Sequence, residues 1–205
     1  MSNYHQSLIV FIDLVKIVEK KDKTYSGYIG GEVNIMGIEI LIAYASKAGS
    51  TGEVAEAIGQ ELRSADAQVD VRPISKVKDI ESYQAVVVGG AMRAGSWLGK
   101  SFIEQNKVFL SKIPVAYFFV CMTLCKDTPE SRAIVEKYLN PVRNIVQPID
   151  EGHFAGKMDY SKLGFFARFI AKSVVKVPEG DFRNWDLIRQ WAKDLYPKIN
   201  ERKKI

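Results

Sequence analysis

The clearest chemistry in this chain lies in a loop of small and hydroxyl-bearing residues: Ser46, Lys47, Ala48, Gly49, Ser50 and Thr51. An apolar run precedes the loop and a helical pattern follows it, so its N–H groups and hydroxyls meet the positive end of a helix dipole. This arrangement suits a single phosphate group. The loop is not a nucleotide P-loop, because it lacks the Gly-Lys-Ser/Thr triplet that meets a β/γ-phosphate and its magnesium. The alternative is an ordinary Ser/Gly turn that caps a helix.

Apolar runs and one alternating stretch, 69–72, predict the five strands that position this loop. They lie at 38–44, 69–72, 85–90, 115–120 and, more weakly, within 145–154. Helical patterns alternate with the strands, which predicts a parallel sheet covered by helices on both faces. Ligands of such sheets bind beyond the carboxyl ends of the strands. The loops after the first, third and fourth strands are therefore expected to share one site.

The helices are marked by their starting residues and by the side chains that they should bury. The first helix is expected to start at Glu53, and a second lies between the third and fourth strands. Thr128-Pro129-Glu130 opens another helix, and the last begins after Asn184. Two of these helices have an apolar face that should point inward, the one that starts at Glu53 and the one that opens at Thr128. The side chains on these faces are Val54, Ala55, Ile58, Leu62, Ala65, Ile134, Val135, Tyr138 and Leu139.

The loop at 46–51 resembles the FMN-phosphate loop of the flavodoxin family, Thr/Ser-x-Thr-Gly-x-Thr. Ala48 departs from that pattern, since the family usually has a hydroxyl there. The resemblance implies a flavodoxin-like fold with a doubly wound, five-stranded parallel sheet. It also implies FMN as the cofactor, with its phosphate held by residues 46–51.

The same resemblance implies that two further loops flank the flavin ring. Glycines in Gly89–Trp97 let the backbone approach a flat ring, and Arg93 can offset negative charge on a reduced flavin. Trp97 either stacks on a ring or packs beneath the loop. Cys121 and Cys125 are either a redox pair or inert buried thiols. The residues expected at the flavin are Ala91, Met92, Arg93, Ala94, Gly95, Cys121, Met122, Thr123, Leu124 and Cys125.

Segment 157–177 has no counterpart in ordinary flavodoxins and predicts an inserted basic amphipathic helix before the last helix. Five cationic residues and one acidic residue in 157–176 account for most of the formal charge of +5. A basic, Phe-rich helix suits an anionic membrane surface. The alternative is a helix that packs on the domain with its charges in solvent. The residues expected to face substrate or membrane are Lys157, Lys162, Phe165, Phe166, Arg168, Phe169, Lys172 and Lys176.

The run Gly156–Tyr160, followed by a Phe/Arg-rich helix, resembles the flavodoxin-type, menaquinone-dependent protoporphyrinogen dehydrogenases of haem synthesis. Gly89–Trp97 and Asn184-Trp185 fit the same family, and the match runs from Ile38 to about Tyr196. This resemblance implies that FMN accepts a hydride from protoporphyrinogen IX and passes electrons to menaquinone or another quinone. The alternatives are a flavodoxin-like electron carrier that serves protein partners and a flavin-free binding module. No protein acid or base is predicted, and His153 is expected to be structural.

Composition sets the remaining expectations. With 205 residues and 47% apolar content, the chain can form one domain around a single core. Two cysteines suit a reducing cytoplasm rather than a disulfide framework, and the two histidines lie far apart, so no metal site is predicted. No apolar run is long enough to cross a bilayer. The expected location is therefore the cytoplasm, and the resemblance and the basic insert imply a peripheral position on the inner face of the membrane. No nucleic-acid partner is expected, and the oligomeric state is left open.

Residues 1–35 are interpreted as an extension before a flavodoxin-like domain at 36–205. Gly30-Gly31-Glu32-Val33 can be encoded by a ribosome-binding sequence at a suitable distance before Met36, which makes Met36 the hypothetical start of the native protein. The alternative is a genuine amphipathic helix that uses Leu8, Phe11, Ile12, Val15 and Val18.

Overall fold

The computed structural model describes residues 28–29, 32–33, 37–93, 96–162, 164, 168–169 and 178–203. The chain divides into a short unit, Met1–Ile38, and a large unit, Glu39–Ile205. In the short unit β1 (Tyr28–Ile29) pairs antiparallel with β2 (Glu32–Val33). The alternative helix in the N-terminal extension and the hypothetical start at Met36 lie outside the described residues.

The large unit is built on a sheet of parallel strands. Its order is β4-β3-β5-β7-β8, and every neighbouring pair on this path runs parallel. This order confirms the predicted doubly wound, five-stranded sheet. The strands are β3 (Glu39–Ala45), β4 (Gln68–Pro73), β5 (Ala85–Arg93), β7 (Val115–Cys121) and β8 (Asp150–Ala155).

Burial follows the position of each strand in the sheet. All seven residues of the inner strand β7 are buried, as expected where helices cover both faces. Edge strand β4 has no fully buried residue. The side chains of Leu41, Val86, Tyr117 and Phe119 belong to one large buried cluster. Within it the Tyr117 hydroxyl donates to the Val146 carbonyl oxygen at 2.7 Å.

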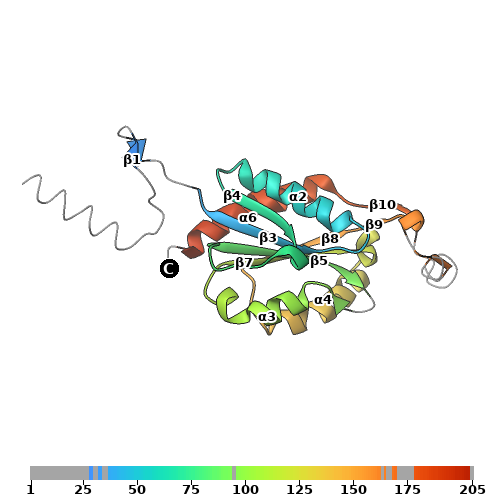
Figure 1. Cartoon of the computed structure of the whole chain (residues 1–205). Helices are drawn as coiled ribbons and strands as arrows, with labels where there is room; N and C mark the ends of the chain where they lie inside the picture. Colours follow the sequence, from blue (N-terminus) through green and yellow to red (C-terminus); the bar gives the residue numbers. More distant parts are fainter. Residues whose placement is uncertain are drawn as a thin grey trace, which may run out of the picture. The chain divides into compact units, whose positions relative to one another are not determined.

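Helices α2 (Ser50–Arg63) and α6 (Trp185–Lys203) lie on one side of the sheet, and α3 (Lys100–Leu110) and α4 (Pro129–Arg143) on the other (Figure 1). Helix α6 starts directly after Asn184, as predicted. Helix α2 starts at Ser50 rather than at Glu53, because Gly49 already turns the chain in the left-handed region. It ends at Arg63, so the expectation that Ala65 lies on its buried face was wrong.

Helix α4 begins as the sequence predicts. Thr128 accepts a hydrogen bond from the Ser131 N–H, and the Ser131 hydroxyl accepts one from the Thr128 N–H, which together form a capping box. Val135 and Leu139 are buried, but Ile134 is 43% exposed. The expectation that Ile134 faces inward was therefore wrong.

Short elements complete the described part of the chain. They are η1 (Ile74–Lys76), β6 (Ser96–Trp97), η2 (Met122–Cys125), β9 (Lys157–Met158), η3 (Tyr160–Lys162) and β10 (Gly180–Asp181). None of the helices that the structure describes has both the length and the apolar character needed to cross a membrane.

Candidate functional site

The loop after β3 has the local geometry of an anion cradle. Gly49 has φ +94°, a conformation that other residues rarely adopt, and its N–H donates to Ser46 Oγ at 2.9 Å. Helix α2 begins at the next residue. The N–H groups of Gly52 and Glu53 in its first turn donate to the Gly49 carbonyl oxygen, which leaves those of Ser50 and Thr51 at the positive end of the helix dipole. Lys47, Ala48 and Gly49 are exposed, so the cradle opens to solvent.

Thr51 is the unusual member of this cradle. Its side chain is fully buried, and Oγ1 has no hydrogen-bond partner among the described residues. A buried hydroxyl without a partner costs about 1–3 kcal/mol, so proteins normally satisfy it. A phosphate oxygen at the start of α2 would supply the missing acceptor. This side chain is the feature of the loop that fits a phosphate better than it fits an ordinary helix cap.

The predicted second loop, Gly89–Trp97, is largely a hairpin. Strand β5 continues to Arg93 and pairs antiparallel with β6, Met92 opposite Trp97 and Arg93 opposite Ser96. Ala94 and Gly95 lie outside the described residues. Ala91 and Met92 are half-buried at the end of β5, where the sequence placed a ring-contacting loop. The prediction of a loop starting at Gly89 was therefore wrong.

Trp97 belongs to the core. It is 2% exposed, and its ring centroid lies 4.8 Å from that of Phe119 and 5.4 Å from that of Tyr117. A Cβ on Gly90 would lie 2.4 Å from Trp97 Nε1, so glycine is required for this close packing. Of the two roles considered for Trp97, packing beneath the hairpin is the one observed.

The third predicted loop folds as the short helix η2 after β7. Cys121 closes the strand and is buried, whereas Thr123 in the loop is exposed. Burial raises the pKa of the Cys121 thiol above its ordinary value. Because the thiolate is the reactive form, this thiol is a poor nucleophile at neutral pH. The geometry therefore favours the inert alternative over a Cys121–Cys125 redox pair.

The insert leaves and rejoins the domain through a small ribbon. Strand β9 pairs antiparallel with β10, Lys157 opposite Asp181 and Met158 opposite Gly180. The Tyr160 N–H donates to Glu179 Oε1 at 3.0 Å, which adds a further link across the base. Segment 157–177 therefore begins with a strand and a 3-10 turn before the part where a helix was predicted.

Of the cationic and aromatic residues predicted on the insert, the structure describes three side chains. Lys157 is half-buried in β9, Arg168 is exposed, and Phe169 is 59% exposed. Arg168 Nε donates to the Tyr160 carbonyl oxygen at 2.8 Å. The backbone of Lys162 is described within η3. Four predicted residues lie outside the described residues: Phe165, Phe166, Lys172 and Lys176.

Arg183 fastens the base of the insert to helix α2. Its side chain is 2% exposed and donates to Asp181 from Nε at 2.8 Å and from Nη2 at 2.5 Å. Its Nη1 reaches Glu53 Oε2 at 2.8 Å and the Ser50 carbonyl oxygen at 3.4 Å. Hydrogen bonding to Arg183 lowers the pKa of Asp181. One guanidinium thus joins β10 to the first turn of the helix that carries the phosphate cradle.

Sequence reasoning missed Arg183, although Asn184-Trp185 beside it was singled out. The guanidinium carbon lies 4.4 Å from the centroid of a Trp185 ring, a cation–π arrangement. An arginine two residues before an aromatic helix start was the available signal. Its carboxylate partner in α2, Glu53, lies 130 positions away in sequence, which no motif reveals.

His153 has a partner that the sequence did not show. Its Nε2 lies 3.2 Å from Glu151 Oε2, and Arg143 donates to both oxygens of the same carboxylate. Burial alone would raise the pKa of Glu151, but the hydrogen bonds from Arg143 and His153 bring it down to about 2. Glu151 is therefore ionised at neutral pH and holds the imidazole in place. This network agrees with the structural role expected for His153.

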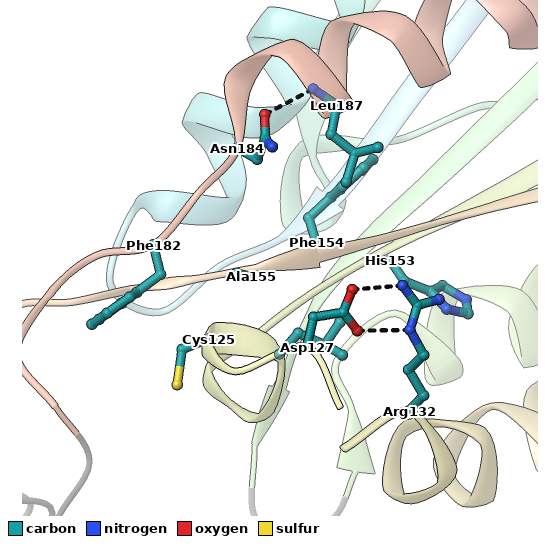
Figure 2. A pocket seen from close by; sticks show the side chains of 10 residues that line it. Cys125, Asp127, Arg132, His153, Phe154, Ala155, Phe182, Asn184 and Leu187 are labelled. Atoms are coloured by element: carbon teal, nitrogen blue, oxygen red, sulfur yellow. Dashed lines mark hydrogen bonds and ion pairs between the residues drawn. The ribbon is translucent and has the colours of Figure 1, made fainter. Parts of the chain in front are cut away.

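A pocket of about 230 Å³ lies beside the carboxyl-terminal half of β8 (Figure 2). Leu124 and Cys125 of η2 form one side, Phe154 and Ala155 of β8 another, and Leu187 closes it from α6. Figure 2 also shows Arg132 joined to Asp127, and Asn184 beside Leu187. The pocket therefore shares η2 with the predicted flavin site.

The three predicted cofactor segments lie at one edge of the sheet. Strands β3, β5 and β7 are adjacent and parallel, so residues 46–51 and 122–125 follow the carboxyl ends of β3 and β7, and residues 91–93 form the carboxyl end of β5 between them (Figure 1). The cradle offers helix N–H groups and the unpaired Thr51 hydroxyl to a phosphate. These residues fit FMN. The role of each residue toward FMN stays a prediction.

Comparisons with known proteins agree with this geometry. Residues 41–184 match the family model described as a flavodoxin domain. A protoporphyrinogen IX dehydrogenase [quinone] of Escherichia coli strain K12 is 22% identical, over 77% of this chain and 94% of that protein. One from Leishmania major is 26% identical, over 76% of this chain and 73% of that protein.

Among solved structures, a short-chain flavodoxin associated with a non-canonical PDU bacterial microcompartment superposes with a TM-score of 0.51. It is 11% identical and covers 80% of this chain and 97% of that one, a likeness in fold alone. Family membership supports the binding of FMN by this chain. A match across most of the chain, together with the confirmed strand order, shows that the protein belongs to the flavodoxin family.

Proposed function

We propose that the protein is an FMN-dependent dehydrogenase that oxidises protoporphyrinogen IX to protoporphyrin IX and passes the electrons to a quinone. The proposal rests on the match to a flavodoxin domain over residues 41–184, in which Arg183 joins the base of segment 157–177 to the helix of the phosphate cradle. Two relatives with the name of this activity match about three quarters of the chain.

The bound cofactor would supply the redox chemistry, which is to take up a hydride and to pass two electrons to the quinone. The chain contributes binding and orientation. Residues 46–51 would hold the phosphate through backbone N–H groups and the Thr51 hydroxyl. The ends of β5 and η2 would hold the ring, close to the carboxyl ends of the strands. The packing of Trp97 against Phe119 in the core holds the hairpin of β5 and β6 in place.

The insert would contact the anionic groups of the substrate or of a membrane. Its cationic residues suit the propionates of the porphyrinogen or the phosphates of a membrane surface. Phe169 is 59% exposed and adds an apolar ring to this basic segment. We therefore propose peripheral association with an anionic membrane, where the quinone is dissolved.

Anaerobic mixing of the FMN-loaded protein with protoporphyrinogen IX tests the function. The flavin absorbance should bleach while porphyrin absorbance grows, and a menaquinone analogue should restore the oxidised flavin. Flavin-free protein is the control, since it reveals porphyrin that forms without the cofactor. A bound flavin that stays oxidised would contradict the proposal and favour an electron carrier that serves protein partners.

A further inference from the structure

The pocket beside β8 has side chains suited to a flat apolar ring. Leu124, Phe154, Phe182 and Leu187 present aliphatic and aromatic side chains to it. Leu124 and Phe154 are buried, whereas Leu187 is 53% exposed at the mouth. Asp127, Arg132, His153 and Asn184 line the rest of it, so polar and apolar side chains share the walls. Small-molecule sites combine apolar walls with polar groups that fix the orientation of the ligand.

Two of the polar groups at this pocket have hydrogen-bond donors left over. Asn184 Oδ1 accepts from the Leu187 N–H at 3.0 Å, so the side-chain oxygen serves the helix start and the Nδ2 amide group is left as a donor. Arg132 gives Nε and Nη2 to Asp127, each at 2.6 Å. A guanidinium has five N–H donors, so further donors remain. A ligand here should therefore carry acceptor oxygens.

Charge and size narrow the class of ligand. Asp127 already balances the charge of Arg132 and occupies its fork, which disfavours a second carboxylate such as a propionate. Pockets for drug-sized ligands span about 300–1,000 Å³. A cavity of about 230 Å³ is therefore small for a tetrapyrrole. A compact, flat, uncharged ring with carbonyl oxygens meets all these conditions.

The position of the pocket matches a redox partner of the flavin. Leu124 and Cys125 line it, and both belong to η2, which the sequence predicts as a wall of the flavin site. We propose that this pocket binds the headgroup of the quinone acceptor, with its carbonyl oxygens facing Asn184 Nδ2 and Arg132. The proposal rests on the quinone-linked function proposed above.

Binding of menadione, a naphthoquinone without an isoprenoid tail, to the oxidised FMN-loaded protein tests this proposal by isothermal titration calorimetry. Leu187→Trp should fill the mouth and weaken menadione binding by about tenfold or more. Gln190→Trp places the same ring on α6 at an exposed residue outside the pocket and should leave the affinity unchanged.

Asn184→Asp tests the proposed hydrogen bond from Asn184 Nδ2 to the quinone. Asp keeps the oxygen that accepts from the Leu187 N–H and is an equally good helix cap, so the melting temperature should not fall. The amide donors are lost, and an acceptor faces the quinone oxygen instead. We expect about fivefold to tenfold weaker binding of menadione, the usual effect of losing one hydrogen bond.

Equal menadione affinity in the wild type, Leu187→Trp and Asn184→Asp would overturn the proposal, as would a wild type that does not bind menadione. Tighter binding of glutarate than of menadione would also overturn it, because the pocket would then select an anion. The proposed function is tested separately, by the reaction of the wild type with protoporphyrinogen. A flavin that protoporphyrinogen does not bleach refutes that function, whereas the variant series decides where menadione binds.

Discussion

The phosphate cradle and the Arg183 junction meet in the first turn of α2, yet they are built in opposite ways. The cradle is local: Ser46 Oγ and the Gly49 N–H lie three residues apart in sequence. The junction joins atoms 133 residues apart, from Arg183 to Ser50. The cradle opens to solvent and leaves one hydroxyl unpaired, while the arginine is buried among its partners.

This difference distinguishes a loop that binds a ligand from a contact that holds two segments of the chain together. A cradle for a ligand must keep polar groups available, so its groups have fewer partners within the protein. A junction that holds two segments together uses its donors within the protein, as Arg183 does with Asp181 and Glu53. If this interpretation holds, substitutions at the junction should act mainly on stability and substitutions in the cradle mainly on FMN affinity.

The largest effect is expected from Arg183→Leu. This change leaves Asp181 and Glu53 facing an apolar side chain, and breaking a buried ion pair typically costs 3–5 kcal/mol. Because both carboxylates keep some access to water, we expect the free energy of unfolding to fall by about 3 kcal/mol, at the lower end of that range. Urea denaturation followed by circular dichroism measures it.

Arg72→Leu is the matched control. Arg72 also pairs with an aspartate, Asp70 at 2.6 Å, but both side chains are about half exposed. Such exposed pairs contribute under about 1 kcal/mol, so a similar loss in both variants would contradict the interpretation.

The junction also predicts a dependence on pH. Arg183 lowers the pKa of Asp181 below its ordinary value of 3.8, so the folded protein favours the ionised form. This contribution to stability is fully present above pH 3.8 and is lost as the pH falls through the lowered pKa. The stability difference between the wild type and Arg183→Leu should therefore narrow below pH 3.8, in denaturation curves recorded at several pH values.

The same contrast explains how much the sequence could predict. The apolar runs predicted β3, β5 and β7, because a strand that is buried on both faces is apolar along its length. Edge strand β4 was predicted from the alternation of its residues. The cradle was found since Ser46–Thr51 is contiguous. By contrast, Gly89–Arg93 looked like a loop from its glycines, and only the packing of Trp97 on Gly90 shows why glycine belongs in that strand. Arg183 and the Glu151–His153 pair depend on partners that folding brings together.

Gly49→Ala tests the geometry of the cradle. Alanine at φ +94° is strained by about 1–2 kcal/mol, so both the stability and the affinity for FMN should fall. Gly164→Ala is the control, because a Cβ there meets nothing within 4 Å and the residue has no positive φ. Fluorescence titration of FMN and thermal unfolding measure the two effects. Unchanged FMN affinity in Gly49→Ala would show that the turn does not shape the cradle.

Thr51→Val separates affinity from stability most sharply. Valine keeps the shape of the buried side chain and removes an unpaired hydroxyl, so the FMN-free protein should be at least as stable as the wild type. Loss of a hydrogen bond to a charged phosphate should weaken FMN binding about tenfold or more.

Thr128→Val gives the opposite pattern and serves as the control. Its hydroxyl is paired with the Ser131 N–H as a helix cap, so stability should fall by about 1 kcal/mol while FMN affinity holds. If Thr51→Val destabilises the FMN-free protein and binds FMN normally, Thr51 is part of the core rather than of the cradle.

The smallest effect is expected beyond the junction, where the insert carries its positive charge. A cation near an anionic membrane contributes about 1 kcal/mol, so Arg168→Gln should weaken binding to phosphatidylglycerol vesicles roughly fivefold.

Arg168→Lys keeps the charge but loses the fork that donates to the Tyr160 carbonyl oxygen. If charge alone matters, this variant should bind vesicles like the wild type, and both variants should respond to added salt. Cosedimentation that is equal for all three proteins and indifferent to salt would refute the membrane-binding role of the insert, and would leave porphyrinogen propionates as the anions that its charge meets.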